Sequence, residues 1–226
     1  MLQRYNFCIG IAIFEFSMEI EEHPFEPFLP PSAQVLFLGT FPAKPLRWSM
    51  DFYYPNFSND FWRIIGLVFF GDASRFEVRG DRPCPASFGT RPSNHWDKAA
   101  IEGFCSGCGL AFSDTARRIS RLKGNASDAS LEVVEAQDIA GLLDLLPECK
   151  AIAATGGLAS EVLAEQFGVA VPVAGETGTI VTGGRRFGFY RLPSTSRAYP
   201  LPLENKAAFY RKMFADLQFP ISHTVR

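Results

Sequence analysis

The sequence predicts an α/β fold, a three-layer α/β/α domain around a central, mostly parallel sheet of four strands. Short uninterrupted apolar runs, which are typical of buried strands, alternate along the chain with segments of helical periodicity. The chain has 226 residues, of which 47% are hydrophobic, so it is long enough to bury a sizeable core as one domain.

The first half of the chain contains two predicted strands and one helix. The run 35–38 (Val-Leu-Phe-Leu) ends abruptly at Gly39-Thr-Phe-Pro42 and predicts a buried strand followed by a loop. Apolar residues with helical spacing follow at 61–69, and Asn59 or Asp60 can cap that helix. A second strand is predicted at 109–113.

The second half continues the alternation. Residues 149–154 predict a third strand that runs through Thr155-Gly-Gly157 into a helix. Two β-rich runs within 179–190, around a Gly-Gly pair, predict a hairpin whose second arm delivers Leu192-Pro-Ser-Thr-Ser196. The segment 203–217 has one apolar face and predicts an amphipathic helix.

The domain limits follow from composition. Residues 77–98 are rich in Gly, Pro, Ser and charged residues and predict a surface insertion. The apolar stretch in residues 1–17 is interrupted by Glu15 and lacks a cleavage site for a secretory signal, and Met18 opens a more ordinary polar start. We therefore expect residues 1–17 to be an N-terminal extension, which either comes from an upstream start or forms a loosely docked arm, and residues 18–226 to form a single domain.

Composition also bounds the location and the partners. Five cysteines at irregular spacing do not resemble the disulfide framework of a secreted domain, so we expect a cytoplasmic protein. No run of about 18 uncharged apolar residues is present, so we expect no membrane span. We expect a monomer.

Polar and glycine-containing segments follow the predicted strands. Ligands of open α/β sheets bind just beyond the carboxyl ends of the strands. The segments in that position are Gly39-Thr-Phe-Pro42, Asp114-Thr-Ala116, Thr155-Gly-Gly157 and Pro193-Ser-Thr-Ser196.

Three stretches together resemble a known family: Leu38-Gly-Thr-Phe-Pro42, Tyr53-Tyr-Pro-Asn-Phe-Ser-Asn-Asp-Phe-Trp62 and Leu192-Pro-Ser-Thr-Ser-Arg197. They are similar to the first motif, the aromatic-Asn segment and the last motif of the uracil-DNA glycosylase superfamily, most of all its hypoxanthine-DNA glycosylase branch. The resemblance extends over most of residues 23–217. It implies a monofunctional DNA N-glycosylase of base-excision repair, which hydrolyses the bond to uracil or hypoxanthine in DNA without a cofactor.

The resemblance also implies the catalytic residues. The Asn of the branch motif Pro-x-Asn-x-Phe-Trp corresponds to Asn59, which would position the attacking water. Because Phe57 stands where the branch has Pro, and Pro55 lies two positions earlier, Asn56 is a second candidate. Relatives with Asp or Asn in the first motif use it for the water, and residues 39–43 contain neither.

The last motif and the segments after the strands supply the residues expected to hold the base. Classical members begin the last motif with His, where this chain has Leu192, so backbone donors, Ser194 or Ser196 would stabilise the departing base. Extruded bases are held by stacking and by contacts to their hydrogen-bonding edge. The expected base-binding residues are Gly39, Thr40, Phe41, Pro42, Tyr53, Tyr54, Asp114, Pro193, Thr195 and Ser196.

Charge gives a mixed indication for DNA binding. The net charge of −2 argues against binding nucleic acid by charge alone, but residues 185–212 contain seven basic residues and one acid. A further basic cluster lies at 117–123. The loop Arg197-Ala-Tyr-Pro200 corresponds to the family's loop that fills the gap left by the flipped base. The expected DNA contacts are Arg186, Arg197, Tyr199 and Lys206.

Simpler interpretations compete with these roles. Tyr53 and Tyr54 fit core packing, and Asn59 fits a helix cap alone. Cys105-Ser-Gly-Cys108 lacks a clear second pair for a metal, and no histidine shows a recognisable pairing with Ser194 for a serine hydrolase. The missing catalytic side chains favour, as an alternative, a catalytically silent nucleic-acid-binding protein of this family; a third interpretation is a small-molecule hydrolase.

Overall fold

The computed structural model describes residues 20–80, 94–121 and 131–221. Its centre is a five-stranded sheet with the strand order β5-β2-β8-β10-β9. The neighbours β5, β2, β8 and β10 run parallel to one another, as predicted. The five strands are β2 (Val35–Gly39), β5 (Leu110–Asp114), β8 (Ala151–Thr155), β9 (Thr177–Thr182) and β10 (Arg185–Leu192).

The predicted number of four strands is wrong, because both arms of the predicted hairpin join the sheet. β9 pairs antiparallel with β10 at the edge, with Arg185 opposite Thr182. Gly183 and Gly184 form the turn with φ angles of 56° and 72°, in the left-handed region that hairpin turns of this kind require. Each parallel strand was predicted from its alternation with a helix. β9 is joined to β10 by a tight turn without a helix between them, so this alternation does not reveal it as a fifth strand of the sheet.

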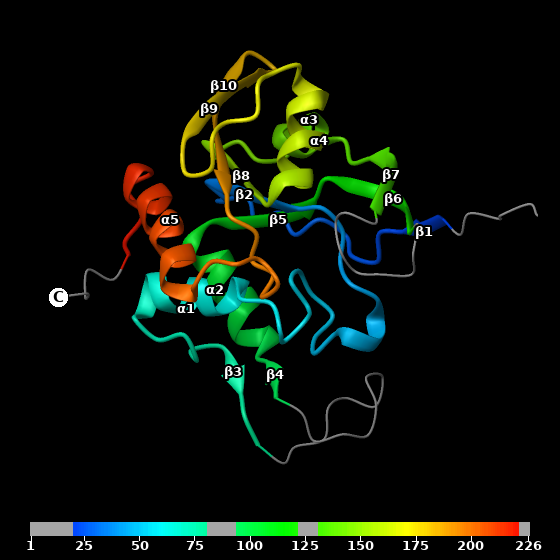
Figure 1. The fold of residues 1–226 in the computed structure, drawn as a ribbon. Helices are drawn as coiled ribbons and strands as arrows, with labels where there is room; N and C mark the ends of the chain where they lie inside the picture. Colours follow the sequence, from blue (N-terminus) through cyan, green and yellow to red (C-terminus); the bar gives the residue numbers. More distant parts are fainter. Residues whose placement is uncertain (1–19, 81–93, 122–130, 222–226) are drawn as a thin grey trace, which may run out of the picture.

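Helices lie on both faces of the sheet (Figure 1). One face carries α1, α2 and α5, and the opposite face carries α3 and α4. None of the helices in the described ranges is both long and apolar enough to cross a membrane. The helices are α1 (Phe61–Phe70), α2 (Lys98–Cys108), α3 (Ile139–Asp144), α4 (Gly157–Phe167) and α5 (Leu203–Asp216).

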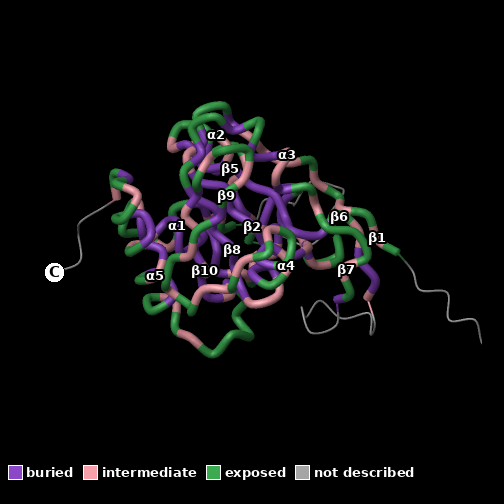
Figure 2. The backbone as a smooth tube through the Cα atoms, turned by 90° about the horizontal axis from the view of Figure 1, so that it is seen from above, coloured by how far each residue is buried: buried purple, intermediate pink, exposed green. Residues whose placement is uncertain are grey.

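The continuous apolar runs are explained by burial on both faces. In β2, Val35 and Phe37 belong to the core beneath α1 and α5, whereas Leu36 and Leu38 belong to the core beneath α3 and α4. Every residue of β2, β5 and β8 is buried, and these strands form the buried centre of the molecule in Figure 2.

A second, smaller sheet adjoins the end of β5. β6 (Ala116–Arg121) begins almost directly after β5 and pairs antiparallel with β1 (Ile20–Glu22) and with β7 (Leu131–Ala136). None of these three strands is predicted by a pattern in the sequence. The basic cluster at 117–123 lies on β6 as far as residue 121, and its remainder lies outside the described residues.

The predicted insertion at 77–98 is bounded by paired strands. β3 (Glu77–Val78) pairs antiparallel with β4 (His95–Trp96), and α2 begins at Lys98. Sequence analysis left this whole segment without regular structure, because strands of two residues show no periodicity. Residues 81–93 and the expected extension 1–17 lie outside the described residues.

Candidate functional site

A crevice of about 760 Å³ opens at the carboxyl edge of the parallel strands. Its size is typical of pockets for small molecules. The ends of β2, β5 and β8 line it, together with the loop before α1 and the loop after β10. The predicted site residues that line it are Gly39, Thr40, Phe41, Pro42, Tyr53, Tyr54, Asn56, Asn59, Asp114, Ser194, Thr195, Ser196 and Tyr199.

Backbone contacts join the two loops across the crevice. The amide N–H of Asp60 donates to the carbonyl of Thr195 at 2.9 Å, and Asn59 and Ser196 form an isolated antiparallel bridge. Segments separated by more than a hundred residues are therefore held in a defined register at the start of α1.

The side chain of Asn59, the residue before the N-cap Asp60, binds the backbone at the start of α1. Its Oδ1 accepts a hydrogen bond of 2.8 Å from the backbone N–H of Phe61. An amide oxygen has two lone pairs, so the second one and the Nδ2 group remain for a ligand or a water molecule. Asn56 makes a similar local bond, from the N–H of Ser58 to its Oδ1 at 2.9 Å. Both side chains line the crevice, so geometry alone does not separate the two candidates.

Tyr54 occupies a strained position beside Asn59. Its φ of 52° lies in the left-handed region, which costs a residue other than glycine about 1–3 kcal/mol and is often found at functional sites. Its ring stacks on that of Phe61, with centroids 3.8 Å apart. Its hydroxyl lies 3.0 Å from Oγ1 of Thr155.

The hydroxyl of Tyr54 is the donor in that contact. Thr155 donates its single hydroxyl proton to the carbonyl of Leu38 at 3.2 Å, so Oγ1 of Thr155 accepts from Tyr54. Burial raises the pKa of Tyr54 well above its ordinary value, which keeps the phenol neutral. The strain of the Tyr54 backbone is thus stabilised by stacking and by a buried hydrogen bond.

Tyr53 is a core residue that also lines the crevice. It is 2% exposed, and its hydroxyl donates to the carbonyl of Glu26 at 3.2 Å. Its ring stacks on Phe112 with centroids 5.8 Å apart. The core interpretation raised for the Tyr pair therefore fits Tyr53, whereas Tyr54 is only partly buried.

The first motif forms the floor of the crevice. The N–H of Gly39 donates to Oδ1 of Asp114 at 3.0 Å, and a Cβ at position 39 would lie 2.6 Å from that oxygen, so only glycine fits. The hydroxyl of Thr40 is buried and has no hydrogen-bond partner among the described atoms, which leaves it for a ligand. The ring of Phe41 is half-buried and lines the crevice.

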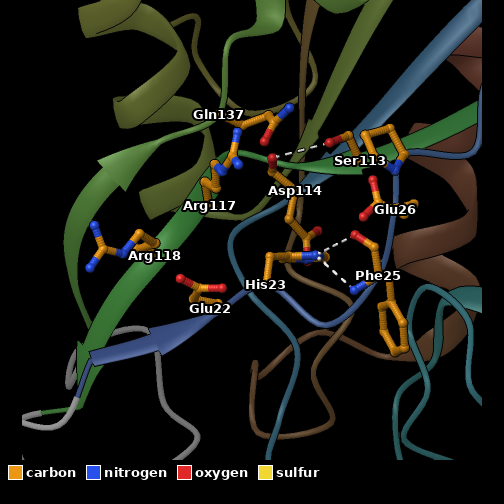
Figure 3. Close-up of a pocket in the computed structure, with 10 residues that line it drawn as sticks. Glu22, His23, Phe25, Glu26, Ser113, Asp114, Arg117, Arg118 and Gln137 are labelled. Carbon is orange, nitrogen blue, oxygen red and sulfur yellow. Dashed lines mark hydrogen bonds and ion pairs between the residues drawn. The ribbon is translucent and has the colours of Figure 1, made fainter.

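A histidine that sequence analysis left without a partner lies behind this floor. Nε2 of His23 is 2.9 Å from Oδ2 of Asp114, and its Nδ1 lies 2.8 Å from the carbonyl of Phe25 (Figure 3). Burial by itself lowers the pKa of His23, but the hydrogen bond and charge of Asp114 outweigh it, and the net shift is upward. The two residues are far apart in the chain, and no local pattern indicates the pair.

Asp114 is the wall between two cavities. Besides the crevice, it lines a smaller cavity of about 190 Å³ that also contains His23, Arg117 and Arg118. With Oδ1 bound to Gly39 and Oδ2 to His23, the carboxylate is fixed at the end of β5. A carboxylate offers about four lone-pair sites, so it can still accept from a ligand in the crevice.

The last motif is folded by its own side chains. Oγ of Ser194 accepts from the N–H of Ser196 at 3.3 Å, and Oγ of Ser196 accepts from the N–H of Ala198 at 3.2 Å. Pro193 is buried and does not line the crevice, and Leu192 packs in the core, where a polar histidine would be out of place.

Lys206 is not available for the DNA contact predicted for it. Its side chain is 1% exposed, and Nζ donates to Oδ2 of Asp60 at 3.0 Å and to the carbonyl of Ser196 at 2.8 Å. A charged ammonium group can be buried here because it is paired with a buried carboxylate, that of Asp60. Arg197 contacts Oδ1 of the same Asp60 at 3.2 Å, but its side chain is 53% exposed and remains accessible.

Arg186 lies at the wrong end of the sheet for the crevice. It is at the start of β10, whereas the crevice adjoins the end of that strand. Its neighbour Arg185 donates to the last carbonyls around α3, and Arg191 donates to the carbonyl of Pro172. Arg185, Arg191 and Lys206 of the basic segment 185–212 therefore make structural contacts within the domain.

The cysteines of the described part do not form a metal site. Cys105 and Cys108 lie on α2 and Cys149 precedes β8, and no group of three or more His, Cys, Asp or Glu in the described ranges could hold a metal ion. Burial raises the pKa of all three thiols. Cys84 lies outside the described residues.

Comparison with known proteins bears on the fold. No protein-family model matches the chain, and no curated protein matches it. A similar solved structure is a solution NMR structure from Methanosarcina acetivorans described as "a putative Uracil DNA glycosylase", with a TM-score of 0.54 and 21% sequence identity, covering 88% of this chain and 99% of that chain. The crevice thus belongs to a chain that shares the fold of this Methanosarcina protein over nearly the whole length of both.

Proposed function

We propose that this protein is a DNA glycosylase that hydrolyses the N-glycosidic bond of a deaminated base, uracil or hypoxanthine, in base-excision repair. The observation that carries the proposal is that Tyr54 and Asn59, from the loop before α1, and Ser194, from the loop after β10, line one crevice. The shared fold with the Methanosarcina protein and the three sequence motifs support the same activity. The last motif, with the sequence Leu192-Pro-Ser-Thr-Ser196, supports a resemblance to the hypoxanthine-DNA glycosylase branch.

An extruded base would enter the crevice edge first. A base inside a duplex is inaccessible, so the nucleotide must leave the stack. The half-buried rings of Tyr54 and Phe41 supply faces on which the base can stack. The buried hydroxyl of Thr40 is free to bond a polar atom of the base.

Asp114 supplies a reason for selecting uracil over cytosine and hypoxanthine over adenine. Uracil and hypoxanthine each carry a ring N–H where cytosine and adenine have a bare nitrogen. A carboxylate can accept a hydrogen bond from the N–H but would meet the bare nitrogen with like partial charge. The hydrogen bonds from Gly39 and His23 hold this carboxylate in place.

Asn59 and the last motif would act on the reacting bond. The amide of Asn59 orients a water molecule whose oxygen bonds to C1′ of the sugar as the bond to the base breaks. The negative charge that develops on the base is met by donors of the segment Ser194–Ser196. The attacking water releases one proton to solvent, and the departed base takes up one. The products are a free base and an abasic site.

The activity is tested on labelled duplexes that carry one uracil or one hypoxanthine. The full chain is incubated with each at stoichiometric concentration and the DNA is treated with alkali. We expect a strand break at the lesion and none in matched duplexes with cytosine or adenine. Intact strands with both lesions would contradict catalysis on these substrates.

The same material tests the alternative of a silent nucleic-acid-binding protein. It is motivated by the absence of Asp and Asn from residues 39–43 and by Leu192 in place of histidine. Salt-dependent binding of lesion-containing DNA, together with no turnover on a wide panel of lesions, is the result that would replace our proposal with this one.

A further inference from the structure

Arg63 is a buried cation that the proposed chemistry does not use. It lies in the first turn of α1 with a side chain that is 8% exposed, and it is not among the described residues that line the crevice. A buried charge is tolerated only where it is paired and hydrogen-bonded. Arg63 finds such partners in two segments, the loop before α1 and the paired strands β3 and β4.

The loop before α1 supplies two backbone carbonyls. Nη1 of Arg63 donates to the carbonyl of Phe57 at 2.8 Å and to the carbonyl of Asn59 at 3.0 Å. The N–H of Asn59 donates to the carbonyl of Asn56 at 2.8 Å. The backbone of Asn59 is therefore held on both sides, at its N–H by the loop itself and at its carbonyl by Arg63.

The strands β3 and β4 hold the guanidinium group of Arg63. Its Nη2 lies 2.7 Å from Oε1 of Glu77, whose side chain is 2% exposed. Its Cζ lies 4.8 Å from the ring centre of Trp96 and 4.7 Å from that of Phe57, and these two rings contact each other with centroids 4.7 Å apart. Glu77 and Trp96 stand opposite each other in the strand pair, so both contacts come from one position of the ladder.

This set of contacts requires an arginine. The guanidinium group is flat, carries five N–H donors in a rigid arrangement and stacks on aromatic rings, whereas the ammonium group of lysine is a compact point charge. In Arg63, Nη1 serves the two carbonyls while Nη2 serves the carboxylate of Glu77. The other oxygen of that carboxylate accepts from Nε of Arg79 at 2.7 Å, so both oxygens of Glu77 are bound.

We propose that Arg63, held by Glu77 and Trp96, is a positioning residue that fixes the amide of Asn59 toward the attacking water. Misplacing a reacting group by about 1 Å can slow catalysis about 100-fold, so a contact outside the crevice can set the rate. The ends of the segment 77–98, which has the composition of a surface insertion, thereby take part in the site. This inference rests on the proposed function, because it concerns the step in which the water is positioned.

The test separates DNA binding from the rate of excision. Arg63→Lys keeps the charge but not the full set of contacts, so single-turnover excision of uracil at saturating enzyme should slow about tenfold or more. The Kd for the same duplex should stay within about twofold, because Arg63 does not line the crevice. Glu77→Gln removes only the charge of the partner and should slow excision by a smaller factor; it replaces Arg63→Lys if that variant does not fold.

Arg185→Lys is the matched control from the opposite end of the sheet. Arg185 also donates to several backbone carbonyls, around the end of α3, and its Cζ lies 4.7 Å from the ring centre of Phe187. Its substitution should lower the urea midpoint without slowing excision by the folded protein. A wild-type excision rate in Arg63→Lys, or an equal loss of rate in both lysine variants, would overturn the positioning role.

A measurement on the free protein distinguishes this inference from the proposed function. Hydrogen exchange of the Phe61 amide, followed by NMR, reports on its bond to Oδ1 of Asn59. Arg63→Lys should speed this exchange about tenfold or more and leave the amides of β2 unchanged, whereas Arg185→Lys should not affect Phe61. Unchanged exchange at Phe61 in Arg63→Lys would also overturn the inference. Faster exchange in a protein that excises no base would refute the glycosylase activity and retain the control of Asn59 by Arg63.

Discussion

The side chain of Asn59 combines a structural contact with a proposed chemical role. Its Oδ1 accepts from the N–H of Phe61, so this bond to the start of α1 fixes the orientation of the amide at the crevice. A side chain held in this way positions a water molecule without further ordering. Truncating the Asn59 side chain would therefore change stability and activity together, and the two effects have to be measured separately.

Asn59→Ala and Asn59→Asp separate the two roles. Aspartate keeps an oxygen for the Phe61 N–H, so its free energy of unfolding should stay near wild type, whereas alanine should lose about 1 kcal/mol. Asn59→Ala should slow single-turnover excision about 100-fold or more, and binding to lesion DNA should be retained. Urea unfolding and excision assays give the two quantities.

Asn56→Ala is the matched control for this prediction, because Asn56 makes the same kind of local bond and also lines the crevice. We expect it to excise at a rate close to wild type. If Asn56→Ala is inactive and Asn59→Ala is active, the water is positioned by Asn56.

At the scale of elements, the decisive contact joins the last motif to the start of α1. Asp60 at the start of α1 accepts from Lys206 of α5 and from Arg197 of the loop, and Lys206 also donates to the Ser196 carbonyl. One buried carboxylate thus connects α1, α5 and the loop after β10. This arrangement holds Ser194–Ser196 opposite Asn59.

Lys206→Met should be strongly destabilising, because it leaves Asp60 buried with only the half-exposed Arg197 as its ionic partner. Removing one member of a buried pair typically costs about 3 kcal/mol or more. The variant should also lose excision at temperatures where it is fully folded, because the loop is no longer held in register. Urea unfolding and excision at low temperature measure both effects.

Lys212→Met is the control from the same helix. Lys212 is 55% exposed and pairs with Asp216 at 3.5 Å, so its loss should cost less than about 1 kcal/mol. Equal destabilisation by the two variants would show that the Lys206 contacts contribute no more than a surface pair.

On the scale of the whole molecule, His23 links the small β1-β6-β7 sheet to the crevice. It follows β1 directly, and its contact with Asp114 reaches the end of the central sheet. The contact stabilises the protonated imidazole, since the pKa of His23 is raised above the ordinary 6.5. The attachment of this segment therefore depends on pH.

The stability contributed by His23 should decrease as the pH rises. A pKa raised in the folded state means that the protonated form stabilises folding, fully below pH 6.5 and less and less as the pH passes the raised pKa. His23→Gln can still donate to Asp114 but cannot titrate. The difference in unfolding free energy between wild type and this variant, from about pH 5.5 to 8.5, should decline with pH. A difference that is constant or increases with pH would contradict the assignment.

The local pattern of apolar residues was sufficient to predict those strands and helices whose structure depends on burial alone. The strands at 35–38, 109–113 and 149–154, the helix after Asn59 and the C-terminal helix were predicted from runs and periodicities, and the structure confirms them. The short strands β3 and β4 and the sheet β1-β6-β7 were missed, because their few residues are held by pairing with distant partners and not by a pattern of their own.

Apolar patterning was enough to predict the parallel α/β core and the segments that meet at its carboxyl edge, because strands buried on both faces are apolar and ligand-binding loops follow them. The charges available at that edge could not be predicted in this way. Folding pairs His23 with Asp114, encloses Lys206 against Asp60 and places Arg186 at the far end of β10. Periodicity reports which side of an element is buried, whereas the partner of a polar group depends on how distant elements pack together.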